Sequence, residues 1–148
     1  MSTRAFGENV QRNEDPRLLR GEGNFVDDIP LHGCLHVAFV RSEHARARII
    51  SLDVSEARAH PDVIAVYTCD DLGDCDQELP LLIPHPCIVG PKTQRPLARD
   101  DVFYTGQAIA MIVAIDRYTA EDAALLVNVE YQPLEVEMDM EAAIIDGA

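Results

Sequence analysis

The chain has 148 residues, and its 12 Lys and Arg against 26 Asp and Glu give a formal net charge of −14 at pH 7. A composition of 47% hydrophobic and 26% charged residues is typical of one soluble globular domain and excludes disordered and fibrous proteins. The negative charge argues strongly against nucleic acid as a partner, because phosphates would be repelled. Residues 61–148 carry 17 acidic and four basic groups, so a charged protein partner would interact mainly with this part of the chain.

No run of about 18 apolar residues is present, and the N-terminus lacks the apolar stretch of a secretory signal. We therefore expect a cytoplasmic protein without a transmembrane segment. In that compartment its four cysteines, Cys34, Cys69, Cys75 and Cys87, are expected to be reduced thiols.

Hydrophobic patterning predicts an α+β or α/β fold with a mixed sheet. Residues 1–33 are polar and rich in turn glycines, which predicts an extended lead-in belonging to the same domain as residues 34–148. Strands are predicted at 34–40, 46–54, 63–68, 108–115 and 127–131. The strand 63–68 has few polar atoms and is expected to be buried on both faces, whereas 108–115 is the most hydrophobic stretch and is expected to be central.

Two or three short helices are predicted beside this mixed sheet. Asp53 or Ser55 is a suitable cap for a brief helix at 56–59, which Pro61 would stop. Thr119 is predicted to cap a helix that runs into the strand 127–131, which suggests a β-α-β unit. A last helix is predicted at 140–145.

Residues 69–101 are predicted to form an irregular loop. Five of the nine prolines fall between Pro80 and Pro96, and proline discourages both helix and strand pairing. A loop of this length inside a small domain is usually functional or covered by a partner.

Several residue groups suggest chemistry, but each also has an ordinary structural explanation, which we favour. His32, Cys34 and His36 alternate and, with Cys87, could bind zinc, and His85 with Cys87 forms a second pair. The other candidates are the acidic residues Asp70, Asp71, Asp74, Asp76 and Glu78, the neighbours Ser42 and His44, the acid pairs Asp27–Asp28 and Asp100–Asp101, and the glycines Gly21 and Gly23. The acidic stretch lacks the order of a calcium loop and reads as a solvated turn, and the two glycines lack the third glycine of a phosphate loop. The residues alone therefore predict no catalytic, cofactor-binding or metal-binding residue.

Six segments nevertheless resemble one family in order along almost the whole chain. They are RNEDPRLLRG at 12–21, GNFVDDI at 23–29, AFVRSEHARARI at 38–49, YTGQAIA at 104–110, DRYTAEDAA at 116–124 and VEYQPL at 129–134. Together they are similar to the large, molybdenum-cofactor-bearing subunit of the xanthine dehydrogenase, aldehyde oxidase and aerobic carbon monoxide dehydrogenase group. Glu43 and Ala108 stand where relatives usually have proline, which changes turn stiffness and not chemistry.

The resemblance implies an α/β hammerhead, the first domain of that subunit, at 34–148 with the loop 69–101 inside it. It implies that this part carries no catalytic residue, and that the molybdopterin-type cofactor is held by the domains that follow. The implied parent reaction is hydroxylation of an aldehyde, an N-heterocycle or a similar molecule, or oxidation of carbon monoxide. The implied partners are the remaining large-subunit domains and the iron–sulfur and flavin subunits.

The chain begins shortly before the matched region and ends about where the hammerhead ends. We therefore expect either an excised domain of an enzyme with separate subunits or a free-standing homologue. The alternative function is a non-enzymatic binding module with an acidic docking surface. An excised domain should expose an apolar docking face, whereas a free-standing protein should be polar over the same surface.

Overall fold

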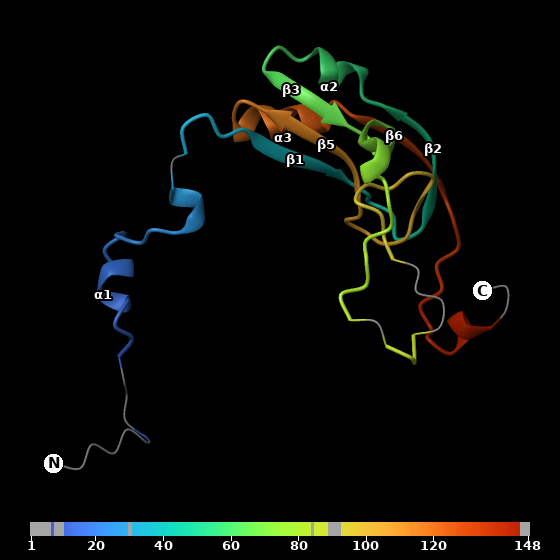
Figure 1. Ribbon diagram of the computed structural model, residues 1–148, viewed down its shortest axis with the longest axis horizontal. Coiled ribbons are helices and arrows are strands. Elements are labelled where there is room, and N and C mark those ends of the chain that lie inside the picture. Colours follow the sequence, from blue (N-terminus) through green and yellow to red (C-terminus); the bar gives the residue numbers. More distant parts are fainter. Residues whose placement is uncertain (1–6, 8–10, 30, 84, 89–92, 146–148) are drawn as a thin grey trace. The chain divides into compact units, whose positions relative to one another are not determined.

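The computed structural model describes residues 7, 11–29, 31–83, 85–88 and 93–145. The chain divides into two compact units, Met1–Cys34 and Leu35–Ala148. The first unit contains the helix α1 (Asp15–Leu18), with Pro16 in its first turn, and a single 3-10 turn at Val26–Asp28 (Figure 1).

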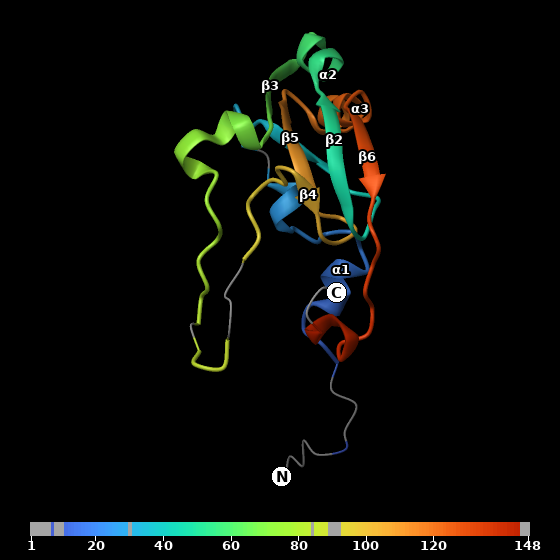
Figure 2. The same cartoon turned by 90° about the vertical axis from the view of Figure 1, so that its right-hand side faces the viewer.

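The second unit is built from two three-stranded antiparallel sheets (Figures 1 and 2). The first sheet has the order β1-β5-β3, with β1 at His36–Arg41, β5 at Ala108–Ala114 and β3 at Val63–Tyr67. The second has the order β4-β2-β6, with β4 at Asp101–Val102, β2 at Ala47–Asp53 and β6 at Asn128–Pro133. The hydrophobic β5 is the central strand of its sheet, as predicted.

The α+β class with few short helices is confirmed, but the expected mixed sheet is replaced by antiparallel pairing throughout the described strands. The β-α-β prediction is wrong because β5 and β6, which flank the helix, lie in different sheets. The chain leaves β5, crosses in the helix α3 (Arg117–Leu125), and pairs β6 with β2 instead.

The helix ends show how local hydrogen bonds fix these boundaries. The N-cap of α3 is Asp116 and not Thr119, because Oδ1 of Asp116 accepts the backbone N–H of Thr119 at 2.8 Å. The N-cap of the helix α2 (Ser55–Ala59) is Val54 and not Asp53 or Ser55, although Asp53 Oδ1 accepts the Ser55 N–H at 2.9 Å just before the helix. The helix predicted at 140–145 is a 3-10 turn, Ala142–Ile144, and a second 3-10 segment spans Cys69–Cys75 within the predicted loop. In the described part of the chain, no helix has the length and apolar character needed to cross a membrane.

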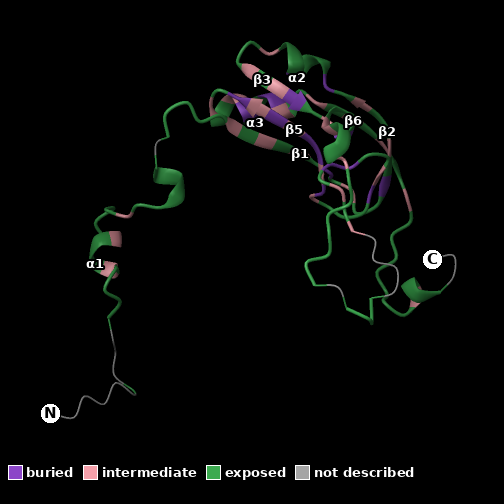
Figure 3. Cartoon of the chain, in the orientation of Figure 1, coloured by how far each residue is buried: buried purple, intermediate pink, exposed green. Residues whose placement is uncertain are grey.

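Two hydrophobic clusters hold the second unit together, and Figure 3 shows buried residues gathered on β3, β5 and α3. The first cluster contains Val54, Ala57, Val66, Ile112 and Ala123, and so joins the β1-β5-β3 sheet to α2 and α3. The second contains Ala47, Ala98, Val102 and Ile109, where β5 meets the other sheet. The prediction that β3 is buried on both faces is wrong, since Val66 is 5% exposed whereas Tyr67, the next residue and so on the opposite face, is 36% exposed.

Candidate functional site

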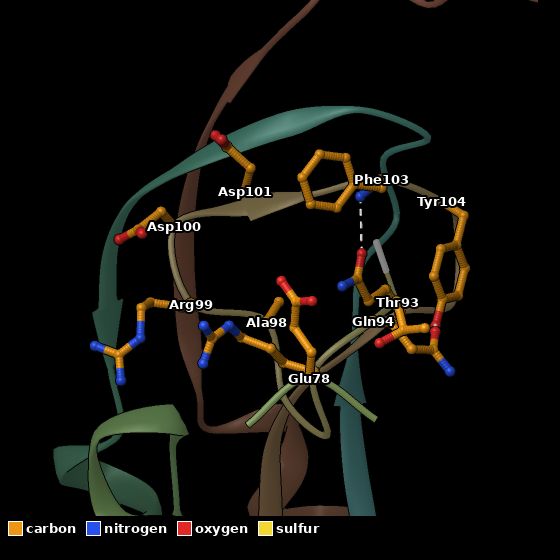
Figure 4. Close-up of a pocket in the computed structure, with 11 residues that line it drawn as sticks. Glu78, Thr93, Gln94, Ala98, Arg99, Asp100, Asp101, Phe103 and Tyr104 are labelled. Carbon is orange, nitrogen blue, oxygen red and sulfur yellow. Dashed lines mark hydrogen bonds between the residues drawn. The ribbon is translucent and has the colours of Figure 1, made fainter. Parts of the chain in front are cut away.

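A pocket of about 600 Å³ in the second unit lies where the loop returns to β4 (Figure 4). Its charged and aromatic lining includes Glu78, Arg95, Arg99, Asp100, Asp101 and Tyr104. The Glu78 carboxylate points into the pocket toward Phe103, whereas the Arg99 guanidinium points toward the 3-10 segment Cys69–Cys75. The backbone N–H of Phe103 donates to Oε1 of the buried Gln107 at 2.8 Å, and this hydrogen bond fixes the turn after β4.

The two arginines of the pocket converge on one buried carboxylate, Asp76, whose side chain is only 5% exposed. Arg99 donates from Nε at 3.0 Å and from Nη2 at 2.5 Å to Asp76 Oδ2, and Arg95 Nη1 lies 3.1 Å from the same oxygen. Arg95 Nη1 also donates to the Asp76 backbone carbonyl at 2.6 Å, and Arg99 Nη1 donates to Asp70 at 2.9 Å. We call this group, Asp70, Asp76, Arg95 and Arg99, the clasp.

Electrostatics in the clasp favour the charged forms. The hydrogen bonds from Arg99 hold the pKa of Asp76 below its ordinary value, and those bonds to Asp76 raise the pKa of Arg99 in turn. The other oxygen of Asp76, Oδ1, is buried without a hydrogen-bond partner among the described residues. The nearby Cys69 thiol has a raised pKa, mainly because it is buried, which makes it a poor nucleophile at neutral pH.

The prediction that the acidic stretch is a solvated turn is therefore partly wrong. Asp76 is buried in the clasp, and Asp71 accepts the Thr68 N–H and an Arg58 guanidinium N–H, each at 2.8 Å. The lining residues of the pocket that the structure describes include no serine, cysteine or histidine.

The other sequence candidates are not brought together as reactive groups. Ser42 Oγ donates to the His44 carbonyl at 2.9 Å and accepts its N–H at 3.0 Å, while the His44 ring packs edge-on against Tyr131. His85 Nδ1 accepts the Cys87 N–H at 3.2 Å in a local turn. Within the described ranges, no three His, Cys, Asp or Glu side chains are grouped to hold a metal ion. The suggested zinc ligands are divided between the units, with His32 and Cys34 in the first and His36 and Cys87 in the second.

The acid pairs Asp27–Asp28 and Asp100–Asp101 have structural surroundings instead. Asp28 Oδ2 accepts the Phe25 N–H at 2.9 Å and so closes the 3-10 turn of the first unit. Asp101 lies 3.5 Å from Arg48 Nε across the β2–β4 pair, and Asp100 lines the pocket.

A feature that sequence analysis did not locate is an apolar face on the β1-β5-β3 sheet. Strand pairing aligns two rows of side chains on the side away from α3, since paired residues share a face. We call these six residues the open face: Val37, Val113 and Ala65 in one row, and Phe39, Met111 and Tyr67 in the other. Val37 is 50% exposed and Phe39 is 41% exposed, so this apolar surface is incompletely covered.

The chain matches a family described as the aldehyde oxidase and xanthine dehydrogenase a/b hammerhead domain, over residues 20–135. The carbon monoxide dehydrogenase large chain of Afipia carboxidovorans is 45% identical over 129 residues, which are 87% of this chain and 15% of that one. The 6-hydroxypseudooxynicotine dehydrogenase complex subunit gamma of Paenarthrobacter nicotinovorans is 40% identical over 142 residues, covering 94% of this chain and 18% of that one.

Among solved structures, a Cu,Mo-CO dehydrogenase matches with a TM-score of 0.77 and 43% identity, over 96% of this chain and 17% of that one. This chain therefore spans 15–18% of the length of the relatives described here. The matched region includes both sheets, α2, α3 and the loop between β3 and β4. The chain belongs to the aldehyde oxidase and xanthine dehydrogenase family, and what it contains of that family is the α/β hammerhead domain of the large subunit.

Proposed function

We propose that the chain is a structural and assembly domain of the large, molybdopterin-binding subunit of a molybdenum-dependent oxidoreductase. The parent enzyme would hydroxylate an aldehyde, an N-heterocycle or a similar small molecule, or oxidise carbon monoxide, in the cytoplasm. Residues 1–33 would belong to the same domain. In this proposal the chain itself supplies no catalytic residue, and its task is to pack against the rest of the large subunit and to help position it beside the iron–sulfur and flavin subunits.

The observation that carries the proposal is the open face. A domain that functions alone buries its large apolar side chains or interrupts them with polar ones, whereas a domain taken from a larger protein leaves its docking side apolar. Every side chain in the two rows of the open face is apolar or aromatic, and Arg41, two residues beyond Phe39 in β1, places its guanidinium carbon 5.3 Å from the centroid of the Phe39 ring. The continuous apolar surface therefore favours packing against another domain.

The described residues do not fit the molybdenum cofactor itself. Phosphate groups of cofactors are commonly held by consecutive backbone N–H groups in glycine-rich turns. The described glycines with positive φ, at positions 7, 21, 33, 73 and 106, are far apart in the sequence, and no metal-ligating group is found among the described side chains. We therefore assign cofactor binding to the other domains of the parent subunit, and we derive no chemical step from this chain.

The proposal is tested by native mass spectrometry with metal analysis on the protein purified from its own cell at endogenous level. We expect the sequence to be recovered in a larger assembly that contains molybdenum and iron. A bare 16.4 kDa monomer without metal would contradict the proposal, and so would molybdenum cofactor bound stoichiometrically to the 148 residues alone.

The alternative, a free-standing module with an acidic docking surface, predicts a different partner complex. Such a complex would join the acidic half of the chain to a basic protein and would dissociate steeply with added salt. A complex held by the open face would instead depend weakly on salt, because apolar burial involves no charge.

A further inference from the structure

The loop between β3 and β4 contains a projecting arm, which we define as the described residues of 76–99. In two perpendicular views it runs out from the end of the sheets and returns (Figures 1 and 2). Its two limbs are tied together, since the Leu79 N–H donates to the Gln94 carbonyl at 3.0 Å and the Thr93 hydroxyl donates to the Leu79 carbonyl. The clasp fixes the base of both limbs to each other.

The far end of the arm is apolar and exposed. We call Leu81, Leu82, Ile83 and Ile88 the tip. Leu82 is 96% exposed and Ile83 is 79% exposed. Adjacent large aliphatic side chains in solvent are unfavourable by themselves, and on a projecting loop they mark an interaction site.

The arm is built to hold its conformation before it meets a partner. In the clasp, two N–H groups of Arg99 donate to one oxygen, Oδ2, of the buried Asp76 carboxylate, and hydrogen bonds between charged groups are the strong ones. Pro80, Pro86 and Pro96 restrict the backbone along both limbs. A pre-organised loop loses less conformational entropy on binding, so its apolar tip contributes more to affinity.

Acidic side chains surround the base of the arm. Residues 70–78 contain five carboxylates, and the three guanidinium groups that pair with them belong to Arg58, Arg95 and Arg99. This leaves a net charge of −2, with Asp74 and Glu78 exposed. Charge of one sign around an apolar contact accelerates association with a separate chain that carries the opposite charge. Domains within one chain are already held together and gain nothing from such steering.

We propose that the arm inserts its apolar tip into a pocket on a separate polypeptide chain of the parent enzyme, and that this pocket is apolar inside and edged by Lys and Arg. This inference depends on the proposed function, because it requires that the chain belongs to an assembly of several polypeptides. It assigns the open face and the tip to different tasks: the open face packs within the large subunit, and the tip joins that subunit to another chain.

The test uses the intact assembly with a benzophenone amino acid placed at position 82, and at position 125 as the control. Leu125, at the end of α3, is 84% exposed and so is a matched apolar site away from the arm. We expect irradiation to cross-link position 82 to a different polypeptide, at an apolar segment flanked by basic residues, and to leave position 125 without that product. Cross-links only within the same polypeptide, or none at position 82, would overturn the inference.

A second measurement uses L82D, with L125D as its control. Leu82 exposes nearly its whole side chain, so its burial at an interface is worth about tenfold or more in affinity, and an aspartate there would also be desolvated. We expect L82D to weaken association of the separate chain at least tenfold and L125D to change it less than about threefold, with both assemblies keeping their large subunit folded by circular dichroism. Equal effects of the two variants would refute the docking role of the tip, whereas failure to recover any assembly even from the wild type would instead refute the proposed function.

Discussion

An isosteric substitution on each face of the β1-β5-β3 sheet tests whether the open face is a docking surface. Thr differs from Val by one hydroxyl in place of a methyl group, so Val→Thr changes polarity with little change of shape. Val37 is half exposed on the open face, and Val66 is 5% exposed in the cluster beneath α2 and α3. In the chain alone, V66T should lower the free energy of unfolding by about 1–3 kcal/mol, because its hydroxyl is buried without a partner. V37T should change it by less than about 0.5 kcal/mol, because its hydroxyl reaches water.

The order of the two effects should change in the assembled enzyme. Once a second domain covers the open face, the Val37→Thr hydroxyl is buried as well, and the docking free energy should weaken by about 1–3 kcal/mol, or about 5- to 150-fold in affinity. Urea unfolding of the chain and titration of the remaining part of the large subunit measure the two quantities. If V37T destabilised the chain alone as much as V66T does, the face would already be covered within this chain. If V37T left docking unchanged, the open face would not be the contact surface.

Three further predictions concern stability and the arm. I112A should lower the free energy of unfolding by about 2–5 kcal/mol in urea, against less than about 0.5 kcal/mol for the exposed I64A. The N–H and hydroxyl of Thr119 hold the pKa of Asp116 below its ordinary value of 3.8. The wild type should therefore have a higher urea midpoint than D116N above pH 3.8, and the difference should disappear as the pH falls through the lower pKa of the folded state. A difference that does not depend on pH would contradict this prediction. R99K removes the paired Nε and Nη2 donors to Asp76 Oδ2 and should speed thermolysin cleavage at residues 81–83, whereas R20K, at an exposed ion pair, should not.

The strands could be predicted because each of the five longer ones carries a hydrophobic pattern of at least five residues. The two-residue strand Asp101–Val102 has no room for such a pattern, although its pairing with Ala47 and Arg48 forms one edge of the second sheet. The division into two sheets was also out of reach, because local periodicity does not say which strand a given strand pairs with. The α3 cap shows a smaller error of the same kind, since Asp116 and Thr119 are both good cap residues and only the backbone geometry selects the first.

The clasp could not be predicted because its partners are 19 to 29 residues apart across a loop without periodicity. The sequence did show an unusual loop and a run of acidic residues. What it lacked was the fold of the loop, which brings the arginines back to Asp76 and buries that carboxylate. The family, in contrast, was identified from the sequence, because six short segments occur in the right order over most of the chain.

The wrong prediction for β3 carries information about function. A continuous apolar run such as Val63–Tyr67 was expected to be covered on both faces, as in a buried strand. In the chain alone only the face with Val66 is covered, and the opposite face presents Ala65 and Tyr67 beside β5. This chain spans less than a fifth of the length of its relatives. The apolar pattern of the strand therefore agrees with the proposed function, in which another domain of the subunit covers the second face. Under the proposed function, the residues of β3 are adapted to a core that two domains complete together, and the apolar open face is the contribution of this domain to that core.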